Sequence, residues 1–192
     1  MNNNIDQLSV KFEKPIYGGE FLGRLPNHKP IFVPFVIPDE VVDIKIINEK
    51  KGFARGTIIS ILENSDKRVI PPCIFFGKCG GCHYQHIGYG DQLKIKQQIV
   101  EEQISRLPGI QKTKINPIVP SPKEFNYRNN IQFSVDNSGK LGFQMHNSNL
   151  IIPIDDCFLP GDQILDIWKM LDLEQFPGLK RVHLREGIQE EL

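Results

Sequence analysis

The sequence predicts a small five-stranded β-barrel followed by an α+β unit. Three observations support this: short apolar segments recur from the N-terminus to about position 70, Gly and Pro punctuate them, and helical and hairpin patterns follow. Several short strands separated by turn residues are typical of a closed barrel. A chain of 192 residues is long enough to bury roughly 70% of the surface that its unfolded form exposes. We therefore expect two domains, residues 1–70 and 71–192.

The barrel strands are identified by alternating or continuous apolar residues between turn signals. Glycines inside these segments suit the sharp bends of a small barrel, because they leave room for close backbone approach. The expected strands are residues 8–12, 18–23, 31–37, 41–47 and 53–62.

The second part of the chain alternates helical and strand patterns. Asp91 is placed to cap a helix over residues 92–107, which the Pro-Gly pair at 108–109 would end. A hairpin is expected across the turn at 136–139, because polar turn residues there separate two apolar runs. The remaining expected elements are strands 128–135, 140–145, 151–154 and 180–186, and a helix 162–173 in which Trp168 packs into the core.

The four cysteines are the main chemical signal. Cys73, Cys79 and Cys82 stand close together in the sequence, and Cys157 lies far downstream. The two glycines between Cys79 and Cys82 let the backbone turn tightly and direct N–H groups at sulfur. Three close ligands with one remote ligand favour a 4Fe-4S cluster over structural zinc, which more often uses two separated pairs.

Other uses of these cysteines stay open: a zinc site, a redox Cys-x-x-Cys pair, disulfides, or inert buried thiols. Disulfides are disfavoured because the first residues have neither the basic nor the apolar stretch of a signal peptide. No apolar run approaches the roughly 20 residues that span a bilayer. We therefore expect a cytoplasmic protein without a membrane partner.

Charge is distributed unevenly although the formal net charge is zero. Residues 73–135 carry 8 basic and 4 acidic residues, whereas residues 136–192 carry 5 basic and 10 acidic. Such asymmetry can mark a polyanion-binding face or ordinary solvated charge. Cations in or beside the barrel turns could reach phosphates, with solvated loop residues as the alternative: Arg24, Lys29, Lys50, Lys51 and Arg55.

The order of these motifs resembles a known family. Gly18-Gly19-Glu-Phe-Leu-Gly23-Arg24, Ile31-Phe-Val-Pro34 and Arg68-Val-Ile-Pro-Pro72-Cys73 resemble a TRAM domain, an OB-like RNA-binding barrel, leading into a cluster site. Cys73-x5-Cys79-Gly-Gly-Cys82, Tyr127-Arg128-Asn129 and the segment ending at Cys157 resemble the iron–sulfur RNA (uracil-5-)-methyltransferases. The best-known members of that family act on 23S ribosomal RNA.

The resemblance implies a role in RNA methylation and rRNA processing, with rRNA favoured over tRNA as partner. It also implies S-adenosylmethionine as methyl donor and a structural 4Fe-4S cluster held by Cys73, Cys79, Cys82 and Cys157. The candidate residues for RNA contact are Tyr127 and Phe133, by base stacking, and Lys78, Arg128 and Lys140, by phosphate pairing. Both aromatic residues lie in strand patterns, in which burial is the default. His83, Gln85 and His86 follow the ligands closely and are expected to hydrogen-bond around them, or to line the RNA side of the cluster.

Members of this family continue into a doubly wound, Rossmann-like α/β domain that binds S-adenosylmethionine. Nothing in the 192 residues matches its glycine-rich turn, and no fifth cysteine is present to serve as nucleophile. We therefore expect a monomeric portion of the enzyme, truncated near the end of its second domain and inactive alone, with no catalytic or cofactor-binding residue.

Two alternatives from other classes are a radical methylthiotransferase and a stand-alone RNA-binding module with structural zinc or an iron–sulfur site. The first uses a Cys-x3-Cys-x2-Cys motif, whereas the spacings here are five and two.

Overall fold

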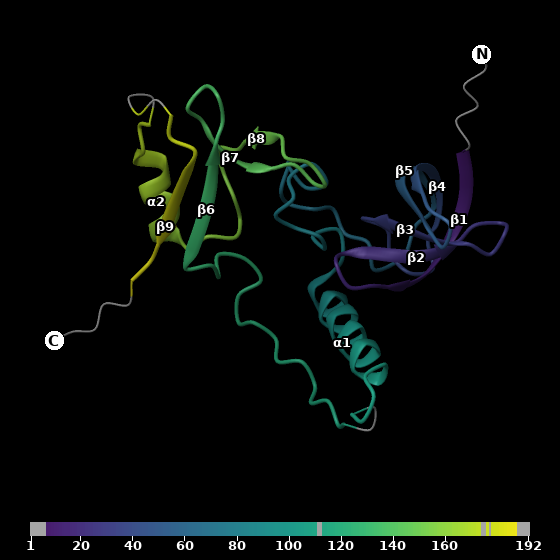
Figure 1. The fold of residues 1–192 in the computed structure, drawn as a ribbon. Coiled ribbons are helices and arrows are strands. Elements are labelled where there is room, and N and C mark those ends of the chain that lie inside the picture. The colour runs from purple at the N-terminus through teal and green to yellow at the C-terminus, as the bar shows by residue number, and fades with distance from the viewer. Residues whose placement is uncertain (1–6, 111–112, 174–175, 177, 188–192) are drawn as a thin grey trace, which may run out of the picture. The chain divides into compact units, whose positions relative to one another are not determined.

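The structure is a computed structural model that describes residues 7–110, 113–173, 176 and 178–187. The chain forms two compact units (Figure 1). The barrel unit contains the residues up to Pro71 together with His83–Pro120, and the sheet unit contains Pro72–Cys82 together with the residues from Ser121 onward. Each unit is thus built from two separate stretches of the chain.

This division differs from the single boundary expected at residue 70. Residues 83–120 return to the barrel unit because two of their side chains, Ile87 and Ile95, complete its apolar core. Along the sequence, the stretch His83–Pro120 therefore lies between the cysteine segment, Pro72–Cys82, and the rest of the sheet unit.

The barrel is closed, as the sequence predicts, with strand order β1-β2-β3-β5-β4. Neighbouring strands are antiparallel, except that β3 pairs with β5 in parallel. Gly23 on β2 permits close packing, since a Cβ there would come within 2.5 Å of the Val10 side chain. The strands are β1 (Gln7–Pro15), β2 (Glu20–Arg24), β3 (Pro30–Pro34), β4 (Val41–Glu49) and β5 (Ala54–Glu63).

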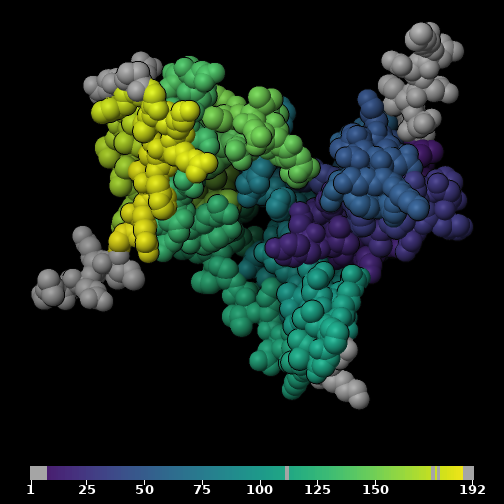
Figure 2. Space-filling model, viewed as in Figure 1, coloured from purple at the N-terminus to yellow at the C-terminus, as the bar shows by residue number. Residues whose placement is uncertain are grey.

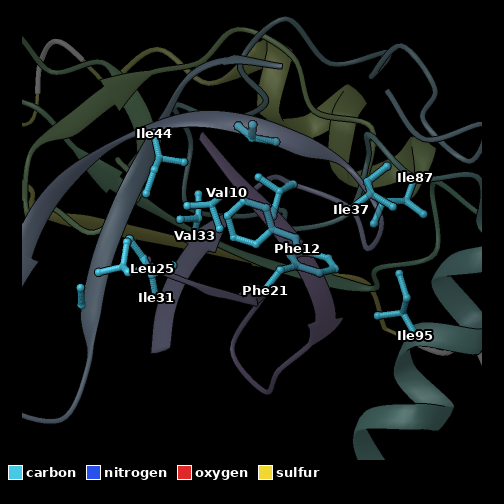
Figure 3. Close-up of a cluster of buried hydrophobic side chains, with 13 residues drawn as sticks. Val10, Phe12, Phe21, Leu25, Ile31, Val33, Ile37, Ile44, Ile87 and Ile95 are labelled. Carbon is cyan, nitrogen blue, oxygen red and sulfur yellow. The ribbon is translucent and has the colours of Figure 1, made fainter. Parts of the chain in front are cut away.

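Fully buried apolar side chains fill the barrel (Figure 3). Phe12, Phe21 and Ile31 are among those with no solvent exposure. Burying each such side chain contributes about 1.5–3 kcal/mol. Ile87 and Ile95 extend the same cluster from outside the strands.

Helix α1 (Tyr89–Ser105) packs on the barrel through Ile95 and the partly buried Ile99. Its side chains lie against those of the N-terminal strands (Figure 2), where Lys14 Nζ and Glu102 Oε1 form an ion pair at 2.5 Å. The helix begins earlier than predicted, at Tyr89 with Gly88 as the N-cap residue. Asp91 lies in the first turn and makes no capping hydrogen bond, so its predicted capping role is wrong.

A buried ion pair fastens the segment after β5 to the barrel. Glu40 has no solvent exposure, and its carboxylate accepts hydrogen bonds from Arg68 Nε at 2.6 Å and Arg68 Nη2 at 2.7 Å. The backbone N–H groups of Ile37 and Ser65 also donate to it. A buried carboxylate is tolerated when its oxygens are paired in this way.

The sheet unit is α+β, as predicted, and its four strands are antiparallel in the order β8-β7-β6-β9. Phe133 and Trp168 occupy its core, with ring centroids 4.5 Å apart. The elements are β6 (Asn130–Val135), β7 (Leu141–Gln144), β8 (Ile151–Pro153), α2 (Asp162–Met170) and β9 (Arg181–Arg185). Among the described residues, no helix is both long and apolar enough to cross a membrane.

Candidate functional site

The segment that carries three of the cysteines folds as consecutive turns held against the sheet unit. The backbone N–H of Cys79 donates to Phe75 O at 2.9 Å, and Gly80 N–H donates to Gln144 O at the end of β7. His146 N–H in turn donates to Lys78 O, which fixes the segment on both sides of Cys79.

The two glycines after Cys79 have separate roles. A Cβ at Gly80 would lie 3.2 Å from Gln144 O, so glycine allows the turn to approach β7 closely. The N–H of Gly81 donates to Cys79 Sγ at 3.4 Å. An N–H directed at sulfur stabilises the thiolate form that binds metals. The role expected of these glycines from the sequence is therefore seen in part at Cys79.

Cys157 reaches the same region from the other side of the unit. It follows β8, and both Cys157 and Cys79 pack against the core around Phe133. The pKa of the Cys157 thiol is raised to about 11: burial is the largest cause, the Leu159 N–H opposes it, and Cys82, Cys73 and Cys79 add to the rise. Cys79 and Cys157 thus share one core cluster, and the thiols of Cys73 and Cys82 act electrostatically on Cys157.

Cys79 experiences a similar environment with one added cation. Burial raises the pKa of its thiol, the Gly81 N–H lowers it, Cys73 raises it and Arg128 lowers it. Arg128 is held nearby because its backbone N–H donates to Leu159 O at 2.9 Å, two residues after Cys157. The charge of Arg128 thus favours anionic sulfur in this cluster of cysteines.

These four cysteines form no disulfide within the described residues and are partly buried. Across the described part of the chain, no three His, Cys, Asp or Glu side chains are already grouped as a metal-ion site. The donor set nevertheless suits a metal centre: four soft sulfur donors share one region, and N–H groups are directed at two of them.

The predicted RNA contacts of the sheet unit have different environments. Phe133 has no solvent exposure and stacks on Phe143 at 5.2 Å between ring centroids, so its predicted stacking on RNA bases is wrong. Its place on the inner face of β6 explains the burial. Tyr127 is 53% exposed and keeps a ring face available. Lys78, Arg128 and Lys140 are also exposed.

Most of the candidate cations of the barrel are paired with carboxylates. Arg24 Nε lies 3.5 Å from Glu13 Oε1, and Lys29 Nζ lies 2.5 Å from Glu49 Oε1. Arg55 Nε lies 3.1 Å from Glu20 Oε1. Phe53 is flanked by cations: Arg55 Cζ lies 5.3 Å and Lys50 Nζ 5.7 Å from its ring centroid. Lys50 and Lys51 are exposed at the β4–β5 turn.

One of the residues expected around the cysteines, His86, is buried elsewhere. His83 and His86 belong to the barrel unit. His86 is 1% exposed, and its Nε2 lies 3.1 Å from Val36 O. The ring of His83 packs against Gly19: a Cβ on Gly19 would lie 2.6 Å from His83 Cγ. The predicted placement of His86 beside the cluster is therefore corrected: it is a packing residue of the barrel.

Sequence reasoning missed a row of basic residues on β9. Arg181, His183 and Arg185 alternate with the partly buried Val182 and Leu184, and all three are exposed. The period-two alternation of residues 181–185 is the signal that could have identified them.

The barrel defines the class of the N-terminal unit. Residues 6–59 match the model of the TRAM domain, a range that extends through β1–β4 and into β5. The barrel unit is thus TRAM-like in both sequence and fold.

Similarity to known proteins extends well beyond that barrel. The chain is 34% identical over 179 residues to an uncharacterized RNA methyltransferase of Aquifex aeolicus, which covers 92% of this chain and 42% of the relative. It is 36% identical over 148 residues to an uncharacterized RNA methyltransferase of Thermotoga maritima, covering 77% of this chain and 33% of the relative. The chain thus spans less than half the length of these curated relatives.

A solved structure has a similar fold: the Pyrococcus abyssi tRNA (uracil-54, C5)-methyltransferase in complex with S-adenosyl-L-homocysteine. The TM-score is 0.56 at 23% identity, and the match covers 97% of this chain and 44% of that chain. At this identity the likeness concerns the fold alone.

Proposed function

We propose that this chain is the RNA-binding and iron–sulfur portion of an S-adenosylmethionine-dependent RNA (uracil-C5)-methyltransferase that acts on 23S ribosomal RNA. The observation that carries the proposal is the extent of similarity: 34% identity to an RNA methyltransferase runs over 92% of the chain, through both units. A shared TRAM domain alone would cover residues 6–59 and would leave the cysteine segment unexplained.

The cysteines are proposed to hold a 4Fe-4S cluster through Cys73, Cys79, Cys82 and Cys157. The mutual influence of the four thiols supports this, as do the N–H groups of Gly81 and Leu159 directed at sulfur. A bound cluster would supply the positive charge that converts buried thiols to thiolates. Methyl transfer from a sulfonium requires no electron, so the role proposed for the cluster is structural.

In this proposal RNA contacts the barrel loops and the exposed cations of the sheet unit. Lys50, Lys51, Lys78 and Arg128 are exposed and suited to phosphate contact, and Tyr127 is suited to stacking on an unpaired base. The 192 residues alone would bind RNA without methylating it, because the four cysteines are committed to the cluster. Turnover by this polypeptide supplied with S-adenosylmethionine would contradict that part.

The cluster is tested by anaerobic purification followed by iron, sulfide and zinc analysis. We expect about four irons and four sulfides per chain and a brown colour that dithionite bleaches. One zinc per chain without colour, from a preparation protected from oxygen, would replace the cluster by a structural zinc site.

The reaction and its substrate are tested by mass spectrometry of RNA from cells that lack the gene. The expected result is the loss of 5-methyluridine from one site of 23S rRNA, restored when the gene is returned. A loss confined to tRNA would change the proposed substrate. Unchanged 5-methyluridine in both RNAs would overturn the methyltransferase proposal.

A further inference from the structure

The strands of the sheet unit have one face that no element of the described chain covers with apolar packing. Alternate residues of β6 and β9 point to opposite sides: Ile131, Phe133 and Val135 are buried on one side with Val182 and Leu184. Strand register places Asn130, Gln132 and Ser134 opposite Arg185, His183 and Arg181 on the other side. We call this second side the open face. Gln144 and Ile151, paired across β7 and β8, continue it.

The charge of the open face differs from that of its surroundings. Residues 136–192 carry 5 basic and 10 acidic residues. None of the open-face residues just named is acidic, while Arg181, His183 and Arg185 are all exposed. Within the described part of the chain, Arg181 and Arg185 form no ion pair. Arg24, Lys29 and Arg55 of the barrel, by contrast, each lie beside a glutamate.

A hollow adjoins the open face at the end of β6. Its volume is about 610 Å³, and the residues that line it include the open-face residues Ser134, Gln144 and Ile151. Asn149, Phe176 and one residue of each charge, Asp136 and Lys180, also line it. Phe176 is 57% exposed, so part of its ring surface is accessible. The hollow therefore combines amide and hydroxyl groups, which can hydrogen-bond to base edges, with an aromatic ring on which a base can stack.

We propose that the open face binds single-stranded RNA, with the backbone along Arg181, His183 and Arg185 and an unpaired base in the hollow. This proposal rests on the RNA-binding function proposed above and assigns it a surface that the sequence did not indicate. Alternate residues of a strand are about 7 Å apart, which is comparable to the separation of consecutive phosphates in an extended RNA strand. Sheets that present cations and polar groups in this way are a common platform for single-stranded RNA.

The test compares RNA binding by the anaerobically purified full chain and by the double variant R181Q/R185Q, with an unstructured RNA oligonucleotide as the probe. Loss of two phosphate contacts should reduce the slope of log affinity against log salt by about 1.4 and weaken binding roughly tenfold at low salt. The matched control is K96Q/K169Q, which removes the same charge from exposed positions on α1 and α2. Fluorescence of Trp168 verifies that the variants are folded.

A second measurement locates the RNA directly. RNA that contains 4-thiouridine is cross-linked to the wild-type chain, and the cross-linked peptides are identified by mass spectrometry. We expect cross-links within residues 144–151 or 176–185. If the wild-type chain binds RNA and the variant R181Q/R185Q binds it no more weakly than the control K96Q/K169Q, the open-face proposal is wrong and the proposed function stands. The same conclusion follows if the cross-links fall only in barrel peptides. Failure of the wild-type chain to bind any RNA would overturn both.

Discussion

Glu40 forms the buried ion pair with Arg68 that holds the segment after β5 against the barrel. Its carboxylate is fully buried and accepts four hydrogen bonds, two of them from Arg68, whose side chain is 20% exposed. Arg68 Nη2 also donates to Phe35 O at 2.9 Å. Because Arg68 lies shortly before Cys73 in the sequence, this pair fixes the chain just before it enters the cysteine segment.

Replacing Glu40 with Gln should destabilise the barrel unit by about 3 kcal/mol, because it leaves the Arg68 charge without its buried partner. Urea unfolding followed by the methyl NMR signals of Ile31 and Ile44 would measure this. The matched control is Glu20→Gln, which breaks the more exposed pair with Arg55 and should cost less than about 1 kcal/mol. Equal effects of the two substitutions would contradict the role given to Glu40.

His86 makes the stability of the barrel depend on pH. The pKa of His86 is lowered to about 4: burial is the largest cause, the hydrogen bond to Val36 O opposes it, Arg68 lowers the pKa further and Glu40 raises it. The unfolded chain therefore binds a proton near pH 6.5 that the folded chain resists until about pH 4. The stability contributed by neutral His86 is full above pH 6.5 and is lost as the pH falls through this window.

Between pH 7.5 and pH 4 the barrel should lose about 3 kcal/mol of stability through His86. Urea unfolding at a series of pH values, compared between wild type and His86→Gln, isolates this contribution from that of the carboxylates. If the unfolding free energies of wild type and H86Q change in parallel with pH, His86 does not contribute this pH dependence.

At the scale of elements, the pairing of β7 with β8 positions the remote cysteine. Gly142 faces Pro153 in this pair, and a Cβ on Gly142 would come within 2.1 Å of Ile152 O. The chain continues from β8 through Ile154, whose N–H donates to Leu141 O, to Cys157. The absence of a side chain at Gly142 is therefore a requirement for bringing Cys157 to the other cysteines.

Replacing Gly142 with Ala should destabilise the sheet unit by about 3 kcal/mol, at the upper end of overpacking effects, because backbone has to move. The iron content of anaerobically purified protein should fall with it. Trp168, the single tryptophan of the sequence, is 7% exposed in the sheet-unit core, so its fluorescence reports unfolding of this unit.

The control for this substitution is Gly90→Ala in α1, where an added Cβ meets no atom within 4 Å. Alanine there should be neutral or stabilising by up to about 1 kcal/mol, because it favours the helix. If G142A and G90A have the same iron content and the same Trp168 fluorescence, then the close approach of Gly142 to β8 is not required.

The elements were largely predictable from the sequence, because periodicity and turn residues are local signals. All five barrel strands, helix α1, and the strands and helix α2 of the sheet unit lie within a few residues of the expected ranges. The errors arose where tertiary packing decides. Phe133 was a candidate for base stacking but is buried, the default for its strand pattern, and His86 follows the cysteines in sequence but packs in the barrel. The ion pair of Arg55 with Glu20, which lies on a different strand, likewise could not be predicted from the local sequence pattern.

At the scale of the whole molecule, the cysteines would join distant parts of the chain. Cys82 and Cys157 are far apart in the sequence, and the chain between them first contributes residues 83–120 to the barrel unit. A cluster that closes so long a loop would stabilise the fold by an amount like that of a crosslink, about 2–4 kcal/mol.

Replacing Cys157 with Ser should therefore lower the bound iron, the thermal stability of the sheet unit and the affinity for RNA together. Iron analysis, Trp168 fluorescence and an RNA titration under anaerobic conditions measure the three quantities. The comparison variant is Gln163→Ala, at an exposed position of α2 in the same unit. Retention of full stability and RNA affinity by an iron-free C157S protein would exclude a structural role for the cluster.

The interleaving of the two units has a consequence for the order of events during synthesis. The strands of the barrel are complete at Glu63, but its apolar core also contains Ile87 and Ile95, so the full core can form only after the ribosome has made the first half of α1. Cys73, Cys79 and Cys82 are made before that point, whereas Cys157 is made long after it. The barrel can therefore finish folding first, and the proposed cluster could be completed only after Cys157 is made.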